Sequence, residues 1–210
     1  MREPDDRWGA ALDAAGAHRG DRFGVFADLV ARHDEPGRHH HDLDHASDVV
    51  DAVLGLHSQG DDWASPVLAA WFHDVVYDPT ASRGTNEGAS AVVAHDALSS
   101  LGASLTSIGS VVRLISLTAT HEPSPNDRSG AVLCDADLSV LGADDDRYDR
   151  YVADVRAEYA HVTDEAWSEG RRRVLRTFLD RSKIFHTEAG RERWEAAART
   201  NISRELSSLA

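Results

Sequence analysis

The chain has 210 residues, of which 41% are hydrophobic and 28% are charged, a composition typical of a folded domain that excludes disorder along its whole length. Its formal net charge is −14, its arginines are dispersed and Lys183 is its only lysine, so it has no basic face for a nucleic-acid polymer. No run of 18 apolar residues and no signal-peptide pattern occurs, so we expect a cytoplasmic protein without a membrane partner.

Apolar residues recur at the 3.6-residue spacing of a helix, and no sustained alternation typical of a strand occurs. We therefore predict an all-α fold. The chain length fits a single domain. In chain order we expect helices over residues 8–15, 21–31, 43–57, 65–77, 85–101, 107–120, 131–141, 145–161, 164–181 and 188–208.

The most apolar of these helices contains the run VLAAWFHDVVY, and we expect it to be central, with Ser65 as its N-cap and Pro66 at its first position. His-Asp dipeptides begin at positions 33, 41, 73 and 95, but only His73-Asp74 is embedded in an apolar helix. An ionised aspartate there costs several kcal/mol unless a cation or dense hydrogen bonding compensates it. The pair is therefore a metal-ligand candidate, and a buried hydrogen bond that only fixes the packing is the alternative.

Two other polar residues also interrupt apolar helical stripes. His45 begins a stripe that continues through Val49 and Val53, and Asp137 shares a stripe with Leu133. Asp135 lies about 200° around the same helix from Asp137. We therefore expect Asp135 to support the ligands from behind or to lie at the surface.

His45, His73, Asp74 and Asp137 together offer two imidazoles and two carboxylates for one divalent metal ion. Such a set suits manganese, iron, cobalt, nickel, zinc or magnesium, and the ligands alone do not choose among them. The absence of a cysteine cluster argues against a closed structural zinc site. A separation of more than about 10 Å between His45 and Asp137 would exclude the centre, because metal–ligand bonds are about 2 Å long.

The order of these ligands resembles the H…HD…D signature of the HD-domain metal-dependent phosphohydrolase superfamily. The segments RHHHDLDH, WFHDVVYD, NEGASA, LTATH, DADLSVLG, VRAEY and GRRRVLRTFL also resemble a bacterial branch known only as predicted HD-superfamily phosphohydrolases, over about residues 20–206. The resemblance implies an HD-domain-like helical bundle in one domain, residues 1–210. Its metal-binding core would span about residues 20–145, and additional C-terminal helices over about 146–210 would pack on it.

The resemblance implies hydrolysis of a small phosphorylated metabolite or nucleotide by a metal-activated water, with a nucleoside monophosphate as the first candidate. Asp74 or Glu87 would orient or deprotonate the water. Tyr77 stands where some mononuclear members have a glutamate, so Asp78, one turn after Asp74, is a further candidate. The alternative function is a non-catalytic metal or nucleotide sensor on the same scaffold, and a helical interaction protein with incidental histidines is a third.

Four residues are candidates for the phosphate: Arg38, His41, His121 and Arg171. Arg171 lies on an apolar stripe and needs an anion there, either the substrate or an internal carboxylate such as Glu205. His121 is also the one histidine placed to bind a second metal ion, but no paired histidine spacing accompanies it. One metal ion is therefore favoured, with two as the alternative, and the oligomeric state is not predicted.

Overall fold

The computed structural model describes residues 6–209 and is all-α, with no strand in that range. The helices are α1 (Asp6–Ala14), α2 (Arg22–His33), α3 (Leu43–Leu56), α4 (Ala64–Phe72), α5 (Thr85–Ser100), α6 (Leu105–Thr118), α7 (Arg128–Asp137), the 3₁₀ helix η1 (Leu138–Gly142), α8 (Asp145–Glu158), α9 (Asp164–Leu179), α10 (Glu188–Gly190), the π-helical turn η2 (Arg191–Glu195) and α11 (Ala196–Ser208). None of the helices described is long and apolar enough to cross a membrane.

Short polar side chains begin most of these helices. An oxygen of each N-cap side chain accepts a hydrogen bond from a backbone N–H of the first turn, which would otherwise lack a partner. The residues that do so are Asp21, Asp42, Ser104, Asp127, Asp144, Thr163 and Thr187. The chain therefore encodes its helix starts locally.

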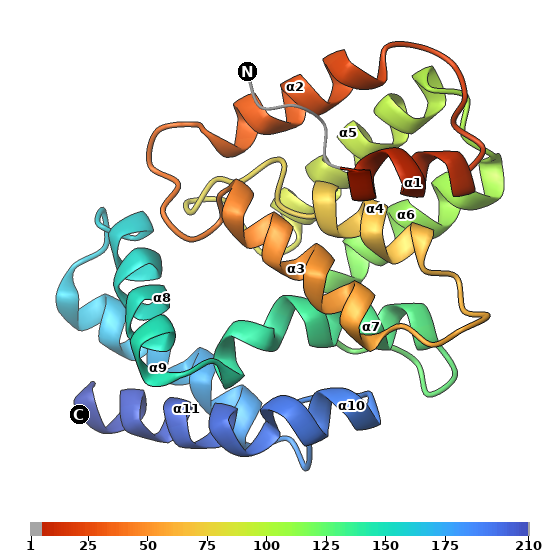
Figure 1. Ribbon diagram of the computed structural model, residues 1–210. Coiled ribbons are helices and arrows are strands. Elements are labelled where there is room, and N and C mark those ends of the chain that lie inside the picture. Colours follow the sequence, from red (N-terminus) through yellow and green to blue (C-terminus); the bar gives the residue numbers. More distant parts are fainter. Residues whose placement is uncertain (1–5, 210) are drawn as a thin grey trace.

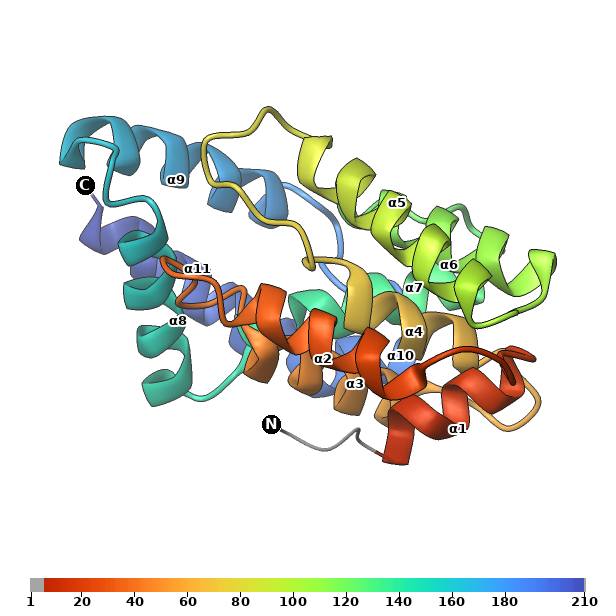
Figure 2. The same ribbon diagram turned by 90° about the horizontal axis from the view of Figure 1, so that it is seen from above.

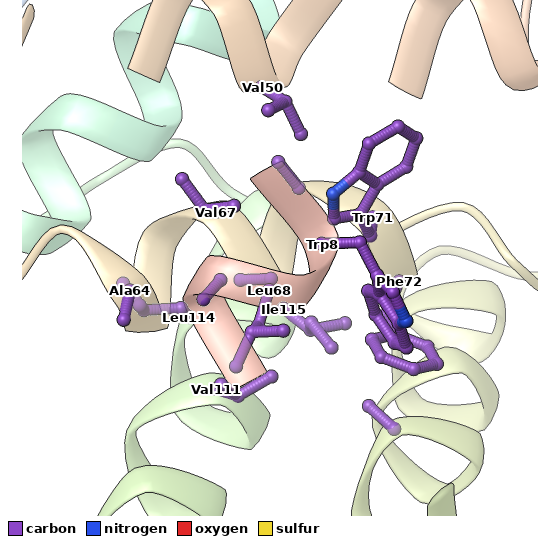
Figure 3. Packing of buried hydrophobic residues seen from close by; sticks show 14 of the residues in the cluster. Trp8, Val50, Ala64, Val67, Leu68, Trp71, Phe72, Val111, Leu114 and Ile115 are labelled. Atoms are coloured by element: carbon purple, nitrogen blue, oxygen red, sulfur yellow. The ribbon is translucent and has the colours of Figure 1, made fainter. Parts of the chain in front are cut away.

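Buried hydrophobic residues form two clusters. The larger one joins α1–α7 around α4, in which every residue is buried, so the predicted central position of this helix is confirmed. Trp8 of α1 packs against Phe72 with ring centroids 5.7 Å apart (Figure 3), and against Phe26 at the same distance. This hydrophobic cluster therefore includes α1, which precedes the expected metal-binding core of about residues 20–145.

The smaller cluster joins η1, α8, α9 and α11 and includes Tyr148, Leu175 and Ile202. These C-terminal helices gather on one side of the α1–α7 bundle in both views of the chain (Figures 1 and 2). Trp194 packs against both clusters.

The central helix is shorter than predicted. Its N-cap is Trp63, so the prediction of Ser65 as the N-cap is wrong. Asp62, one residue earlier, accepts a hydrogen bond from the Ser65 backbone N–H (3.1 Å). The helix ends at Phe72, which places Asp74 beyond it. Beyond this end the Val76 backbone N–H donates to Ser90 Oγ (3.0 Å) and not to the Phe72 carbonyl, and the carbonyls of Asp74 and Val75 accept hydrogen bonds from Arg38.

Candidate metal centre

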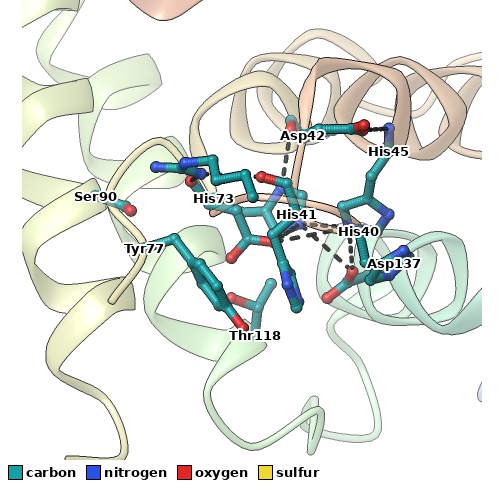
Figure 4. Close-up of polar contacts among 12 residues, drawn as sticks. His40, His41, Asp42, His45, His73, Tyr77, Ser90, Thr118 and Asp137 are labelled. Atoms are coloured by element: carbon teal, nitrogen blue, oxygen red, sulfur yellow. Dashed lines mark hydrogen bonds and ion pairs between the residues drawn. The ribbon is translucent and has the colours of Figure 1, made fainter. Parts of the chain in front are cut away.

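The four predicted ligands converge where α3, α4 and α7 meet (Figure 4). His73 Nε2 lies 3.0 Å from Asp74 Oδ2 and 3.4 Å from Asp137 Oδ1. His45 Nε2 lies 3.3 Å from His73 Nε2 and 3.3 Å from Asp137 Oδ1. It also lies 3.7 Å from Asp74 Oδ2. The large separation of His45 and Asp137 that would exclude the centre does not occur.

These distances match those between neighbouring ligands of one ion. For a metal–ligand distance of about 2.1 Å, neighbouring donors are about 3.0 Å apart in an octahedron and about 3.4 Å apart in a tetrahedron. The donor atoms of His45, His73 and Asp74 all lie within 4.8 Å of one another, so these residues could hold a metal ion. Asp137 Oδ1 lies within the same range of both histidines.

Each ligand is oriented by a neighbouring group. Asp42, the N-cap of α3, accepts a hydrogen bond from the His45 backbone N–H (3.0 Å) and so fixes the helix turn that carries this ligand. His73 Nδ1 lies 2.9 Å from a backbone carbonyl one turn earlier, which directs Nε2 at the centre. His121 Nε2 lies 2.8 Å from Asp137 Oδ2, the oxygen that faces away from the other ligands. His121 has a φ of 53°, a left-handed conformation that non-glycine residues rarely adopt.

The electrostatics of the centre favour positive charge. Burial alone would lower the pKa of His73, but the carboxylates of Asp74 and Asp137 raise it well above its usual value. Burial alone would raise the pKa of both carboxyls, but the charge of His73 holds them below their usual range. A proton on His73 therefore neutralises part of the two carboxylates, and a bound cation could replace that proton.

A buried carboxylate on α8 holds the segment that precedes α3. Glu158 Oε1 accepts hydrogen bonds from the backbone N–H groups of His39, His40 and His41 at 2.8–2.9 Å. Glu158 Oε2 accepts one from the Tyr77 hydroxyl (2.9 Å) and lies 2.6 Å from His41 Nδ1. The His41 ring stacks on the Tyr77 ring with centroids 4.1 Å apart. His41, a predicted substrate-binding residue, is thereby fixed at the edge of the centre.

The Arg38 guanidinium is engaged with backbone carbonyls, so phosphate binding by Arg38 is not supported. Its side chain is 3% exposed. One nitrogen donates to the backbone carbonyls of His41 (3.0 Å) and Asp74 (2.6 Å), and the other donates to that of Val75 (3.1 Å). Arg38 thus ties the segment before α3 to the chain after α4 and positions the ligands on both.

Arg171 forms an ion pair with an internal carboxylate, the partner that the sequence left as an alternative. Its Nε and Nη2 donate to the two oxygens of Glu205 at 2.7 and 3.1 Å, and its Nη1 donates to the Tyr151 hydroxyl at 3.1 Å. The side chains of Arg171 and Glu205 are 7% and 3% exposed. The guanidinium is therefore committed to joining α9 with α8 and α11, and phosphate binding by Arg171 is not supported.

The two further acid–base candidates differ in their surroundings. Asp78 is exposed, and its carboxylate accepts hydrogen bonds from the backbone N–H and hydroxyl of Thr80 (2.8 and 2.7 Å). These hydrogen bonds lower the pKa of Asp78, which makes it a weaker base. Glu87 is partly buried in the first turn of α5.

Asp135 is a fully buried structural residue and not a surface group. Its carboxylate accepts hydrogen bonds from the backbone N–H groups of His186 (2.6 Å) and Thr187 (2.7 Å) and from the Thr187 hydroxyl (2.7 Å). It therefore fixes the start of α10 against α7.

Sequence reasoning missed Glu158 and His40. Glu158 shares the inner stripe of α8 with Tyr148 and Val155, so the test that identified Asp137, a carboxylate on an apolar stripe, would have found it. Within the triplet His39-His40-His41, the ring of His40 lies 4.5 Å from the His45 ring and 4.7 Å from the Tyr151 ring. Nothing in the sequence of the triplet distinguishes His40 from its neighbours.

The centre opens into a cavity of about 710 Å³. His45, His73, Asp74 and Asp137 line one end together with His41 and His121, and Asp78 and Glu87 line the side formed by residues 77–87. Apolar residues of α8 and α9 line the opposite side. The size is ordinary for a small-molecule site.

Comparisons of the chain with models of protein families, with curated proteins and with solved structures found no match in any of the three. The function of the centre must therefore be inferred from its own residues. Those residues form a buried cluster of histidine and aspartate that could hold a metal ion at the end of a cavity.

Proposed function

We propose that the chain is a metal-dependent phosphohydrolase with an HD-type helical bundle, and that it hydrolyses a small phosphomonoester. The observation that carries the proposal is the convergence of His45, His73, Asp74 and Asp137 at metal-ligand spacing at one end of a cavity. Four protein ligands leave two positions open on a six-coordinate ion, as a catalytic site requires.

The donor set favours one divalent ion. Two imidazoles and two carboxylates suit manganese, iron, cobalt, nickel or zinc better than magnesium, which prefers oxygen ligands. In residues 6–209 the only group of three or more potential metal ligands is His45, His73 and Asp74. His121 is directed at Asp137, which supports a positioning role and not a second metal site.

A bound divalent ion would supply Lewis acidity, which lowers the pKa of water and balances charge on phosphoryl oxygens.

The protein's own residues supply the rest. Glu87 lines the cavity, has no hydrogen-bond partner in the part of the chain that the structure describes, and is our candidate to accept a proton from the attacking water. The ring of His41, fixed by Glu158, borders the space beside the ligands and is our candidate to contact the phosphoryl group. The reaction forms a P–O bond to water and breaks the ester P–O bond, and the alcohol leaves with a proton.

The test combines metal analysis with turnover. Protein purified without chelators should contain close to one divalent ion per chain, and it should release phosphate from at least one member of a panel of phosphomonoesters when Mn²⁺, Co²⁺, Ni²⁺ or Zn²⁺ is supplied. Asp74→Ala should lose the ion and at least about 100-fold in rate, since replacing even residues that only support metal ligands costs 10–100-fold.

Asp96→Ala is a matched control, because Asp96 belongs to the exposed His95-Asp96 pair on α5. This variant should keep both the ion and the rate. Stoichiometric metal with no turnover of any ester would support the sensor function instead. No bound metal in the wild type, together with no effect of Asp74→Ala, would leave the buried cluster as a packing feature.

A further inference from the structure

The cavity wall that faces the metal centre is apolar and aromatic. Tyr151, Val155 and Tyr159 of the α8 segment line it, and Trp167, Val174 and Phe178 of α9 continue it. The rings of Tyr159 and Trp167 lie 5.5 Å apart. In the view from above, α9 lies across from the segment that leads into α5 (Figure 2). Residues of both segments line the cavity.

Two arginines of α9, Arg171 and Arg173, also line the cavity, and both are engaged within the protein. Arg173 donates a hydrogen bond to Glu169 (2.9 Å). Arg171 is paired with Glu205 and Tyr151, as described above. Arg156 packs over the Trp167 ring at 5.5 Å and donates hydrogen bonds to the backbone carbonyls of Tyr159 (2.8 Å) and Val162 (3.2 Å). The side chains of Arg156 and Arg171 therefore brace the aromatic residues, and their hydrogen bonds are made within the protein.

Gly170 widens the cavity in the middle of this wall. It lies between Trp167 and Val174 on the stripe of α9 that lines the cavity. A glycine inside a helix is destabilising relative to alanine, so it needs a reason. Gly170 does not have a positive φ, and a Cβ placed there would meet no atom within 4 Å. Neither the backbone conformation nor crowding by neighbouring atoms explains why position 170 is a glycine. The effect of the missing side chain is to leave space beside the aromatic residues.

We propose that this wall is a subsite for a bulky apolar group, so that the substrate is the phosphomonoester of a hydrophobic alcohol, aromatic or branched alkyl. The proposal rests on the proposed phosphohydrolase function, with the phosphate at the metal centre and the apolar group beside Gly170. Val174, which is 48% exposed although it lines the cavity, gains burial from such a ligand. A sugar phosphate would leave its hydroxyl groups against a wall with few free hydrogen-bonding groups.

The experiment measures binding and does not depend on turnover. Isothermal titration of the Mn²⁺-loaded protein would compare 2-naphthylmethylphosphonate with methylphosphonate, two non-hydrolysable phosphate mimics that differ in the apolar group. The wild type should bind the naphthyl compound at least about tenfold more tightly. Gly170→Leu should abolish that difference and leave the affinity for methylphosphonate unchanged.

Gly109→Leu is the matched control, because Gly109 is an exposed interior glycine of α6 with equally open space around its Cβ position and does not line the cavity. It should bind like the wild type. Val174→Lys provides a second, partly exposed position and should also weaken naphthyl binding. Equal affinities for the two phosphonates in the wild type, or no effect of Gly170→Leu, would overturn the subsite.

A third probe, 2-naphthylmethanol, separates the two proposals because it lacks the phosphonate. If neither phosphonate binds but the alcohol binds in a manner that Gly170→Leu weakens, the apolar subsite stands and the phosphohydrolase proposal fails. If methylphosphonate binds and the naphthyl group adds nothing, the subsite fails while the metal centre stands. If none of the three compounds binds, both proposals fail.

Discussion

Removing the Glu158 carboxylate should strongly destabilise the protein. Its side chain is fully buried and links α8 to residues 39–41 and to Tyr77 through five contacts. Burial alone would raise the pKa of Glu158, but hydrogen bonds from His41 and from the backbone hold it well below the usual range. The group is therefore an anion whose stabilisation depends on these donors.

The size of the effect follows from what Glu158→Ala leaves behind. Three backbone N–H groups and the polar atoms of His41 and Tyr77 lose their acceptor, and each buried unsatisfied group costs about 1–3 kcal/mol. Water can enter the space that the Glu158 side chain leaves and supply hydrogen-bond partners to some of these groups. We therefore expect a total loss of about 3–5 kcal/mol in the free energy of unfolding, the cost of breaking a buried ion pair. Glu158→Gln keeps one acceptor oxygen and should lose about half as much.

Urea unfolding followed by tryptophan fluorescence at pH 7.5 measures this change. Glu169→Ala is the control, since Glu169 forms an exposed pair with Arg173 on α9 and should cost less than about 1 kcal/mol. The difference in free energy of unfolding between wild type and Glu158→Ala should shrink as the pH falls below 4.5, the ordinary pKa of glutamate. The reason is that a carboxyl whose pKa is lowered in the folded protein adds its full stabilisation only at pH values above its pKa in the unfolded chain. A cost below about 1 kcal/mol for Glu158→Ala at pH 7.5 would refute this account.

Two further predictions concern buried charge. Burial lowers the pKa of His33 from 6.5 to about 4. As the pH falls, His33 is therefore protonated in the unfolded chain before it is protonated in the folded protein. The free energy of unfolding should drop by about 3 kcal/mol between pH 7 and 4 for this reason. Urea titrations of His33→Leu should lack that part of the slope, and identical slopes would contradict the assignment. Arg171→Met should cost about 3–5 kcal/mol because it leaves Glu205 as an unpaired buried charge. Adding Glu205→Gln should recover part of the loss, and a coupling below about 0.5 kcal/mol in this double-mutant cycle would show that the pair is not energetically linked.

Local pattern was enough to predict the helices and to single out the histidines and aspartates of the buried cluster. Apolar spacing predicted the all-α class and the central position of α4, because helix formation and burial of an apolar stripe depend on neighbours three and four residues apart. His45 and Asp137 were identifiable because a polar group on an apolar stripe needs compensation wherever the stripe packs. Tertiary structure then brought their donor atoms within 3.3 Å.

The remaining features depend on contacts between distant parts of the chain. The chain after α4 is held by Arg38, which lies 36 residues from Asp74, and the segment before α3 is held by Glu158, 117–119 residues away. From the sequence, the partner of Arg171 could be either the substrate or an internal carboxylate such as Glu205. The sequence could not decide between them, because an arginine on an apolar stripe pairs with whichever anion the packing brings near. The sequence by itself determined the elements and the charged groups that had to be compensated. Only the tertiary structure decided which partners compensate them and that the histidine–aspartate cluster opens into a cavity with an apolar wall.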